Sequence, residues 1–341
     1  MHDFRGAAWR ATMVFETGES LPYCVEERMQ YATFGRTGLR VSVVGLGAGG
    51  PSKLGKATDR SEEESIALVR RALELGINYI DTAENYGTEE IIGKAIRGFD
   101  RHGLVLSTKK STFRGDRPLQ AKEFAEGVET SLRRLGVETI DVFHFHGPTL
   151  DKYPHAVDVL VPELLRLQQA GKIGHLAVSE RFPADLEHSV LRQAIADDIF
   201  DVVMVGFNIL NQTAREEVLP AAAKKGVATE CMFAVRRAFC RPDRFKEILG
   251  ELGDCGEIDA EIVGMSDPLA WALEASEAGS VPELAYRFCR YEPGIDLVLT
   301  GTGNVRHLEE NVASMLRPPL PAGVTERLRL MFGRVRSASG W

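Results

Sequence analysis

The chain has 341 residues, of which 44% are hydrophobic and 26% charged, a composition typical of a globular protein with ample length for a core. Its 41 basic and 49 acidic residues give a net charge of −8, which argues against nucleic acid or an anionic membrane as the main partner. Five cysteines without a Cys-x-x-Cys pair, no apolar run of roughly 20 residues and no apolar leader argue against a disulfide framework, a membrane helix and a secretory signal, and favour a cytoplasmic protein.

The first part of the chain divides into an extension and a hairpin. Residues 1–28 show no clear periodicity, and we expect them to form an N-terminal extension before a single domain over 29–341. Strands over 30–34 and 39–42, joined by the glycine-bounded turn 35–38, predict an N-terminal β-hairpin at the start of this domain.

From residue 41 the chain alternates regularly between predicted strands and helices. A buried strand over 41–47 is followed by a helix over 61–75, which Ser61 and Glu64 begin as a capping box. Short apolar runs predict further strands near residues 77–81, 104–108, 140–145, 173–178, 202–207, 227–232 and 296–300. Further helices are expected near residues 88–97, 120–134, 157–170, 184–195, 213–225, 281–290 and 305–315. Eight strand–helix units without a linker favour an α/β fold of the (β/α)8 TIM-barrel type.

One connection in this pattern is long. Residues 237–279 follow the predicted seventh strand and contain no convincing strand of their own. Long loops after barrel strands lie over the catalytic face and are often functional, so we expect a lid or specificity element here. A peripheral insertion that only packs against the barrel is the alternative.

Four polar residues stand at or just beyond three successive strand ends. Asp81, Lys109 and His146 end their predicted strands, and Tyr86 lies in the loop after the first of these. A buried lysine needs a counter-ion, which Asp81 can supply. We expect Lys109 to lower the pKa of the Tyr86 phenol from about 10, so that Tyr86 acts as a general acid near neutral pH. The alternative is a structural Asp–Lys pair with an unrelated tyrosine and histidine.

Several motifs together resemble the aldo-keto reductase superfamily, from about Gln30 to the C-terminal helix. The matching pieces are Gly35-Arg36-Thr37-Gly38-Leu39, Asp81-Thr82-Ala83 with Tyr86-Gly87, Ser107-Thr108-Lys109, Asp141-Val142-Phe143-His144-Phe145-His146, Gly301-Thr302-Gly303-Asn304 and Leu308-Glu309-Glu310-Asn311. The resemblance implies a barrel that binds NADPH in an extended form without a Rossmann domain. It also implies an oxidoreductase that reduces an aldehyde or ketone, or oxidises the corresponding alcohol or sugar.

The same resemblance implies a role for each member of a catalytic tetrad. Nicotinamide gives hydride to a carbonyl carbon, Tyr86 protonates the oxygen, Lys109 and Asp81 tune Tyr86, and His146 orients the carbonyl. Cofactor contacts are implied for Gly47, Ala48, Gly49, Asp81, Ser179, Glu180, Met204, Met232, Phe233, Val235, Arg236, Gly301, Thr302, Gly303, Asn304, His307, Glu310 and Asn311. The turn 301–304 also suits a phosphate on its own terms, because it opens a predicted helix; a plain turn capped by Asn304 is the alternative.

This chain departs from the family pattern at several cofactor positions. The turn 301–304 has no basic residue for a 2′-phosphate and His307 stands at a further position that is often basic, so NADH is the alternative cofactor to NADPH. The arginines that could compensate are Arg236, Arg237 and Arg306. On the nicotinamide side the usual Asn, Gln and stacking aromatic are replaced by Glu180, Met204 and Met232. These changes predict unusual substrates or weakened redox function, although both methionines also suit a barrel core.

Two further motifs have alternative interpretations. The glycines from Gly45 to Gly50 do not open a helix as a Rossmann fingerprint would, since Pro51 and a dozen more residues precede the next helix. The pair His144 and His146 shares a strand face and could ligate a metal, but no other histidine ends a predicted strand, so we expect no metal site.

Two non-redox functions are also compatible with the pattern. Potassium-channel β subunits resemble this family and act mainly as cofactor-sensing partners, and the tetrad could instead serve a dehydration or isomerisation. The resemblance implies a small carbonyl compound or alcohol as the substrate. Candidate apolar walls of the pocket are Phe113, Phe145, Phe233 and Trp271.

Overall fold

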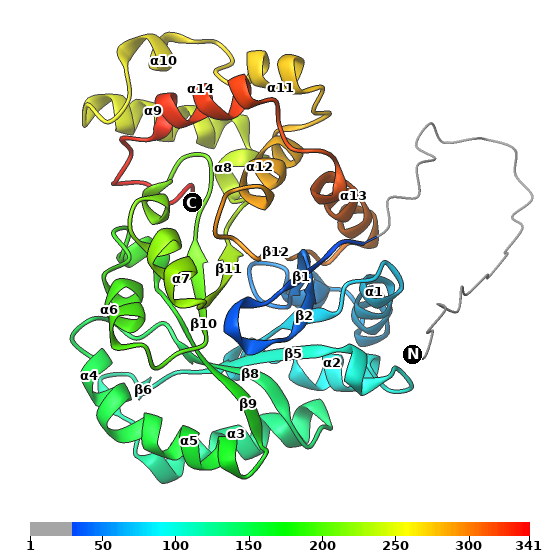
Figure 1. Ribbon diagram of the computed structural model, residues 1–341. Coiled ribbons are helices and arrows are strands. Elements are labelled where there is room, and N and C mark those ends of the chain that lie inside the picture. The colour runs from blue at the N-terminus through cyan, green and yellow to red at the C-terminus, as the bar shows by residue number, and fades with distance from the viewer. Residues whose placement is uncertain (1–28) are drawn as a thin grey trace, which may run out of the picture.

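A computed structural model describes residues 29–341 as a closed barrel of eight parallel strands surrounded by helices (Figure 1). The extension expected over residues 1–28 lies outside the described part of the chain. The barrel strands are, in their order around the barrel, β3 (Val44–Gly47), β4 (Tyr79–Asp81), β5 (Val105–Lys110), β8 (Ile140–His146), β9 (Ile173–Ser179), β10 (Val202–Gly206), β11 (Ala228–Met232) and β12 (Leu297–Thr300). All eight predicted strands are present, and the predicted (β/α)8 fold is confirmed.

The predicted hairpin closes the N-terminal end of the barrel. Strands β1 (Tyr31–Thr33) and β2 (Arg40–Ser42) pair antiparallel. Phe34 follows β1 and packs edge-on against Tyr79, with the ring centroids 5.5 Å apart. The hairpin therefore places the Phe34 ring against the N-terminal end of the barrel interior.

Helices cover the outside of the barrel as expected. They are α1 (Glu62–Glu74), α2 (Glu89–Ala95), α3 (Ala121–Leu135), α4 (Tyr153–His155), α5 (Val161–Gln169), α6 (Ser189–Asp197), α7 (Val218–Lys225), α12 (Val281–Arg290), α13 (Val305–Leu316) and α14 (Ala322–Phe332). The capping box of Ser61 and Glu64 is present at α1. The helix predicted from residue 184 begins only at Ser189, because the Asp185 carboxylate accepts hydrogen bonds from the first backbone N–H groups of α6.

The long connection after β11 is helical rather than an open loop. It forms α8 (Arg237–Cys240), α9 (Pro242–Asp254), α10 (Ala260–Gly264) and α11 (Ala270–Ser276), shown in yellow tones in Figure 1. These helices pack against α12 and α14, and Arg334 near the C-terminal end pairs with Asp259 of the connection at 2.5 Å. The lid or specificity role expected for this connection stays a prediction.

Side chains fill the barrel interior in layers. Toward the N-terminal end the layer is almost entirely apolar, formed by Tyr79, Val105, Val142, Ala177, Val202, Ala228 and Leu297. Two residues further along the strands, side chains again point inward, and several of them are polar, among them the fully buried Ser107, His144 and Glu230. Barrel interiors are normally dominated by branched apolar residues, so this polar layer is unusual.

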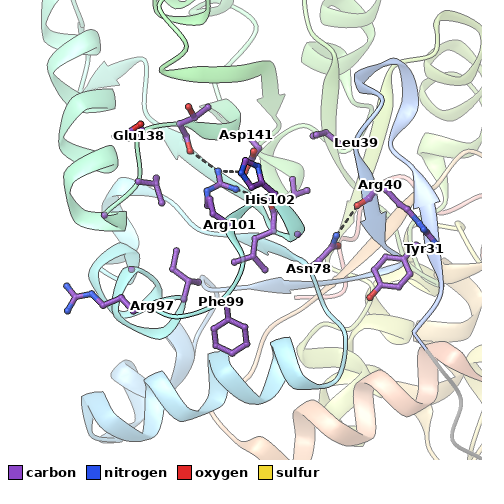
Figure 2. Close-up of a pocket in the computed structure, with 18 residues that line it drawn as sticks. Tyr31, Leu39, Arg40, Asn78, Arg97, Phe99, Arg101, His102, Glu138 and Asp141 are labelled. Carbon is purple, nitrogen blue, oxygen red and sulfur yellow. Dashed lines mark hydrogen bonds and ion pairs between the residues drawn. The ribbon is translucent and has the colours of Figure 1, made fainter. Parts of the chain in front are cut away.

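A cavity of about 870 Å³ lies at the N-terminal end of β4, β5 and β8 (Figure 2). Asp81, Lys109 and His146 lie at the opposite, C-terminal ends of these strands. The Arg101 guanidinium donates to the Asp141 carboxylate at 2.6 Å, and the Asn78 amide donates to the Arg40 carbonyl oxygen at 2.9 Å. These contacts join the starts of neighbouring elements. Within residues 29–341 no helix is long and apolar enough to cross a membrane.

Candidate active site

Four side chains converge at the C-terminal end of the barrel. Asp81 ends β4, Lys109 lies near the end of β5, and His146 ends β8. Tyr86 closes a short 3₁₀ turn, Glu84–Tyr86, directly after β4. Because neighbouring parallel strands end on the same side, the register brings residues far apart in sequence together, as the sequence predicts.

Asp81 and Lys109 form a buried ion pair. The Lys109 ammonium nitrogen lies 2.5 Å from each carboxylate oxygen of Asp81 and donates to the Thr82 carbonyl oxygen at 2.9 Å. Ser107 adds a hydroxyl donor to Asp81 at 2.9 Å. Burial by itself lowers the pKa of Lys109, but Asp81, together with Tyr86 and Glu230, raises it by more, and the net shift is upward. Lys109 is therefore held as a cation.

Tyr86 lies between this pair and His146. Its hydroxyl is 3.5 Å from Nε2 of His146, and the two rings meet edge-on. The Lys109 ammonium lies 5.5 Å from the centre of the Tyr86 ring. Gly49 faces a carbon edge of the Tyr86 ring. A Cβ at this position would lie 2.5 Å from the ring, so glycine is needed to leave room for it.

The expected lowering of the Tyr86 pKa is wrong for this arrangement. Burial raises the pKa of Tyr86 and outweighs the lowering effect of Lys109, whose ammonium is engaged by Asp81. Burial also lowers the pKa of His146 to about 3, with Lys109 contributing in the same direction. At neutral pH the site therefore presents a protonated phenol beside a neutral imidazole, a set that can donate hydrogen bonds to a carbonyl oxygen.

A second buried pair lies beneath the tetrad and was missed from the sequence. Nε2 of His144 is 2.8 Å from a carboxyl oxygen of Glu230, and neither side chain is exposed. Polar atoms of Asp81, His144 and Glu230 all lie within 4.8 Å of one another. The sequence does contain an indication of a buried acid. Glu230 lies in a strand predicted to be buried on both faces, two residues from Ala228 and from Met232.

The side of the barrel mouth implied for nicotinamide is lined by an apolar cluster. Met204 and Met232 are buried and pack with Phe182, a residue that sequence reasoning did not single out. The Phe182 ring lies over Gly206, where a Cβ would be only 2.1 Å from it, and it stacks on Phe233 at 6.1 Å. Gly206 thus provides the space that lets Phe182 enter the mouth.

Glu180 is engaged in a separate network. Its carboxylate contacts Nδ1 of His188 at 2.8 Å and accepts the Gly206 backbone N–H at 2.7 Å. The neighbouring Ser179 hydroxyl accepts the Gly147 N–H at 3.0 Å. The resemblance implies a carboxamide-binding asparagine at the position of Glu180. The Glu180 carboxylate is instead occupied by contacts with protein groups.

The turn 301–304 follows β12 and opens α13. Asn304 caps the helix by accepting from the Arg306 N–H, and the Thr302 hydroxyl accepts the Asn304 N–H. The Asn311 amide donates to the Thr300 hydroxyl at 2.9 Å. A Cβ at Gly303 would lie 2.6 Å from Gly55, so close packing against the β3–α1 connection requires glycine there. His307 and Glu310, further along α13, are exposed.

The turn also approaches the end of the first barrel strand. A Cβ on Gly301 would lie 3.0 Å from the carbonyl oxygen of Gly47. Ala48 is buried, and its N–H donates to the Asp81 carbonyl oxygen at 2.7 Å. The predicted cofactor residues of the first and last strands are thus adjacent to each other and to the tetrad.

Arg236 is a buried cation at the end of the segment after β11. Its guanidinium lies 3.9 Å from the Phe233 ring centre and 4.7 Å from that of Trp341, and Val235 precedes it half-buried. Among the residues described, Nε and Nη1 of Arg236 have no hydrogen-bond partner. Burial lowers the pKa of Arg236 to about 10. Unsatisfied buried donors on a cation fit an anionic ligand such as the phosphates of a dinucleotide.

The four aromatic residues expected to line the substrate pocket lie in different parts of the structure. Phe233 lies at the mouth, stacked on Phe182. Phe145 is fully buried among core aromatics on the helix side, and Trp271 lies against Arg327 of α14 at 4.0 Å. Phe113 packs edge-on against His155.

The two histidines weighed as a metal pair face different partners. His144 contacts Glu230, whereas His146 contacts Tyr86. The Lys109 ammonium already lies against both carboxylate oxygens of Asp81. A cation from the protein itself therefore balances the carboxylate that a metal would need.

Known proteins resemble this chain over most of its length. Residues 44–329 match the model of the aldo/keto reductase family. The chain is 30% identical over 305 residues to the aldo-keto reductase YhdN of Bacillus subtilis, covering 82% of this chain and 87% of that protein. It is 26% identical over 296 residues to the L-galactose dehydrogenase of Arabidopsis thaliana, covering 84% and 88%.

Solved structures share the fold. The holo form of aldo-keto reductase AKR11C1 from Bacillus halodurans superposes with a TM-score of 0.67 at 23% identity, covering 91% of this chain and 97% of that one. An aldo/keto reductase from Klebsiella pneumoniae in complex with NADP and acetate superposes with a TM-score of 0.64 at 20% identity, covering 89% and 95%.

Proposed function

The chain belongs to the aldo/keto reductase family, and on that premise we propose that it is an NAD(P)H-dependent oxidoreductase that interconverts a small carbonyl compound and its alcohol or sugar. The observation that carries the proposal is the convergence of Tyr86, His146 and the Asp81–Lys109 ion pair at one end of the barrel. A phenol held protonated beside a cation is a general acid for a carbonyl oxygen.

When bound, the cofactor supplies the hydride. The side chains supply the proton and the electrostatics. His146 is neutral and orients the carbonyl oxygen, and the Tyr86 hydroxyl donates its proton to that oxygen as negative charge develops there. The Lys109 ammonium stabilises the phenolate that remains, and Asp81 keeps Lys109 charged and in place. In the oxidative direction the same phenolate accepts the proton of the alcohol.

The cofactor would be held mainly by groups beyond the tetrad. The unsatisfied guanidinium of Arg236 suits its phosphates, and the turn 301–304 at the start of α13 suits its adenosine end. We propose NADPH as the cofactor, with NADH as the alternative, because the turn itself carries no basic residue.

Calorimetric titration with NADPH and with NADH tests the proposal, followed by a panel of aldehydes, ketones and sugars with either cofactor. We expect NADPH binding that weakens at least tenfold in Arg236→Gln, since a hydrogen bond to a charged group contributes about 1.5–3 kcal/mol. Arg166→Gln, on α5 and with a mostly exposed side chain, is the matched control and should bind like the unaltered protein. Binding of neither dinucleotide would overturn the proposal.

A second candidate is a barrel without redox turnover, either a dehydratase or isomerase or a cofactor-sensing partner subunit. The packing of Phe182 with Met204 and Met232 favours it, because an apolar cluster fills part of the mouth on the implied nicotinamide side. Tight cofactor binding without turnover of any carbonyl or alcohol would support this candidate.

A further inference from the structure

The contact between His144 and Glu230 crosses the barrel interior. His144 comes from β8 and Glu230 from β11, strands that are not neighbours in the sheet. Their polar atoms lie 2.8 Å apart, and both side chains have no exposed surface. Burying an unpaired carboxylate is costly, so an acid at this depth must share a proton or a charge with its surroundings.

The charged and titratable groups around Glu230 belong to the tetrad and its support. Tyr79 and Asp81 face it from β4, Lys109 from β5 and His144 from β8. From the two strands that flank β11, the residues in register with Glu230 are apolar, namely Met204 and Leu297. Lys109 is thus the cation that acts on the pKa of Glu230, and the Asp81 carboxylate already balances the charge of Lys109.

The protonation state of the pair follows from this charge balance. Burial lowers the pKa of His144 to about 3, with Lys109 adding to the shift, so the imidazole is neutral. Burial raises the pKa of Glu230 to about 7, against the opposing effect of Lys109. At pH values lower than about 7, this group of buried side chains carries no net charge. At higher pH, Glu230 adds one negative charge beneath Lys109 and Tyr86.

We propose that Glu230 and His144 are positioning residues that hold one exchangeable proton beneath Lys109 and so set the pH at which Tyr86 loses its own proton. This inference rests on the proposed reductase function of the tetrad. When Glu230 ionises, its charge favours the protonated forms of Lys109 and Tyr86. The general acid is thereby retained at alkaline pH, and the phenolate that oxidation needs forms only at higher pH.

The test is the pH dependence of kcat and kcat/KM in both directions for the unaltered protein and Glu230→Gln. The amide removes the negative charge, so the alkaline limb of reduction should shift to lower pH by about one unit, and the rise of oxidation should shift the same way. Glu292→Gln is the matched control, because Glu292 is also a buried acid but pairs with Arg215. Its profiles should superpose on those of the unaltered protein.

A measurement without turnover separates this inference from the proposed function. Infrared titration of the protein without cofactor should detect a protonated carboxyl group that disappears near neutral pH, that is absent from Glu230→Gln and that is retained in Glu292→Gln. In His144→Gln its titration should shift, so this variant decides the case even if Glu230→Gln does not fold. Ultraviolet titration of Tyr86, taken as the difference from Tyr86→Phe, should move to lower pH in Glu230→Gln.

Two results would overturn the inference. One is a Glu230 carboxylate that stays ionised throughout a titration from about pH 5 to about pH 9, the range in which buried acids titrate. The other is an unchanged Tyr86 titration in Glu230→Gln. Failure of the proposed function alone would leave both titrations as expected while no dinucleotide binds.

Discussion

At the scale of single residues, the site depends on how burial and charge compete. Burial favours the neutral forms of Tyr86 and His146, whereas the ion pair with Asp81 keeps Lys109 charged. The result is a proton donor beside a neutral hydrogen-bonding group and a fixed cation. The sequence indicates which residues meet, but the direction of the Tyr86 shift depends on how deeply the ring is buried.

Replacing Tyr86 by Phe should remove the proton donor and keep the fold. We expect kcat to fall by about 10²–10⁴-fold, the usual contribution of general acid–base catalysis, with the dissociation constant of the cofactor unchanged. Steady-state kinetics and calorimetry measure the two quantities. Tyr31→Phe, on the hairpin at the opposite end, is the control. Equal turnover in Tyr86→Phe and the unaltered protein would contradict the assigned role.

Replacing Lys109 by Met should cost both activity and stability. The buried Asp81 carboxylate would lose its cation, a change that typically costs about 3–5 kcal/mol. Turnover should fall at least about 10²-fold, because the phenolate loses its stabilising charge. Lys110→Met is the matched control, since Lys110 pairs instead with Glu84. Undiminished activity with an unchanged pH profile in Lys109→Met would refute the role.

The raised pKa of Glu230 also makes a prediction for stability against pH. A carboxyl whose folded pKa is about 7 against an ordinary 4.5 stabilises the fold below pH 4.5, and this contribution is lost as pH rises toward 7. The loss is on the order of 3 kcal/mol. Glu230→Gln should therefore gain stability relative to the unaltered protein between pH 4.5 and 8, as chemical denaturation would measure. A difference independent of pH would contradict this.

At the scale of elements, strand ends and one glycine determine the shape of the mouth. Strand β10 ends at Gly206, and the turn after β9 places the Phe182 ring over it. Met204 and Met232 complete the apolar side of the mouth. The sequence identifies both methionines as departures from the family but not the ring that packs on them, because Phe182 lies beyond its strand and its direction depends on the turn.

Replacing Gly206 by Ala should displace Phe182. The new Cβ would lie within 2.1 Å of the ring, and overpacking of this kind typically costs about 1–3 kcal/mol. Gly250→Ala, within α9 and with no neighbour near its Cβ, is the control and should stabilise by about 0.5–1 kcal/mol. Thermal unfolding measures both. An unchanged melting temperature in Gly206→Ala would show that the ring moves without cost.

At the scale of the whole molecule, the residues that close the barrel and the residues proposed for catalysis lie at opposite ends of the strands. The hairpin and the apolar layer close the N-terminal end, while the tetrad lies at the C-terminal end. The connection after β11 packs with α12 and α14 as a helical unit beside the barrel. Changes at one end should therefore leave the other largely unaffected.

Replacing Phe34 by Ala tests this separation. The side chain is fully buried against Tyr79, and large-to-small changes of this kind cost about 3–5 kcal/mol. Turnover measured below the melting temperature should stay within a few-fold of the unaltered protein. Leu330→Ala, whose side chain is mostly exposed, should change stability by less than about 0.5 kcal/mol. A loss of turnover equal to that of Tyr86→Phe would contradict the separation.

The sequence by itself determined the barrel, its hairpin and the four polar residues that meet at the strand ends, because period, caps and residue type are local properties that each element carries. Only the tertiary structure decided that the connection after β11 is helical, that Phe182 enters the mouth, and that Glu230 meets His144. His144 and Glu230 lie on strands distant in sequence, and closure of the barrel brings their polar atoms to within 2.8 Å of each other.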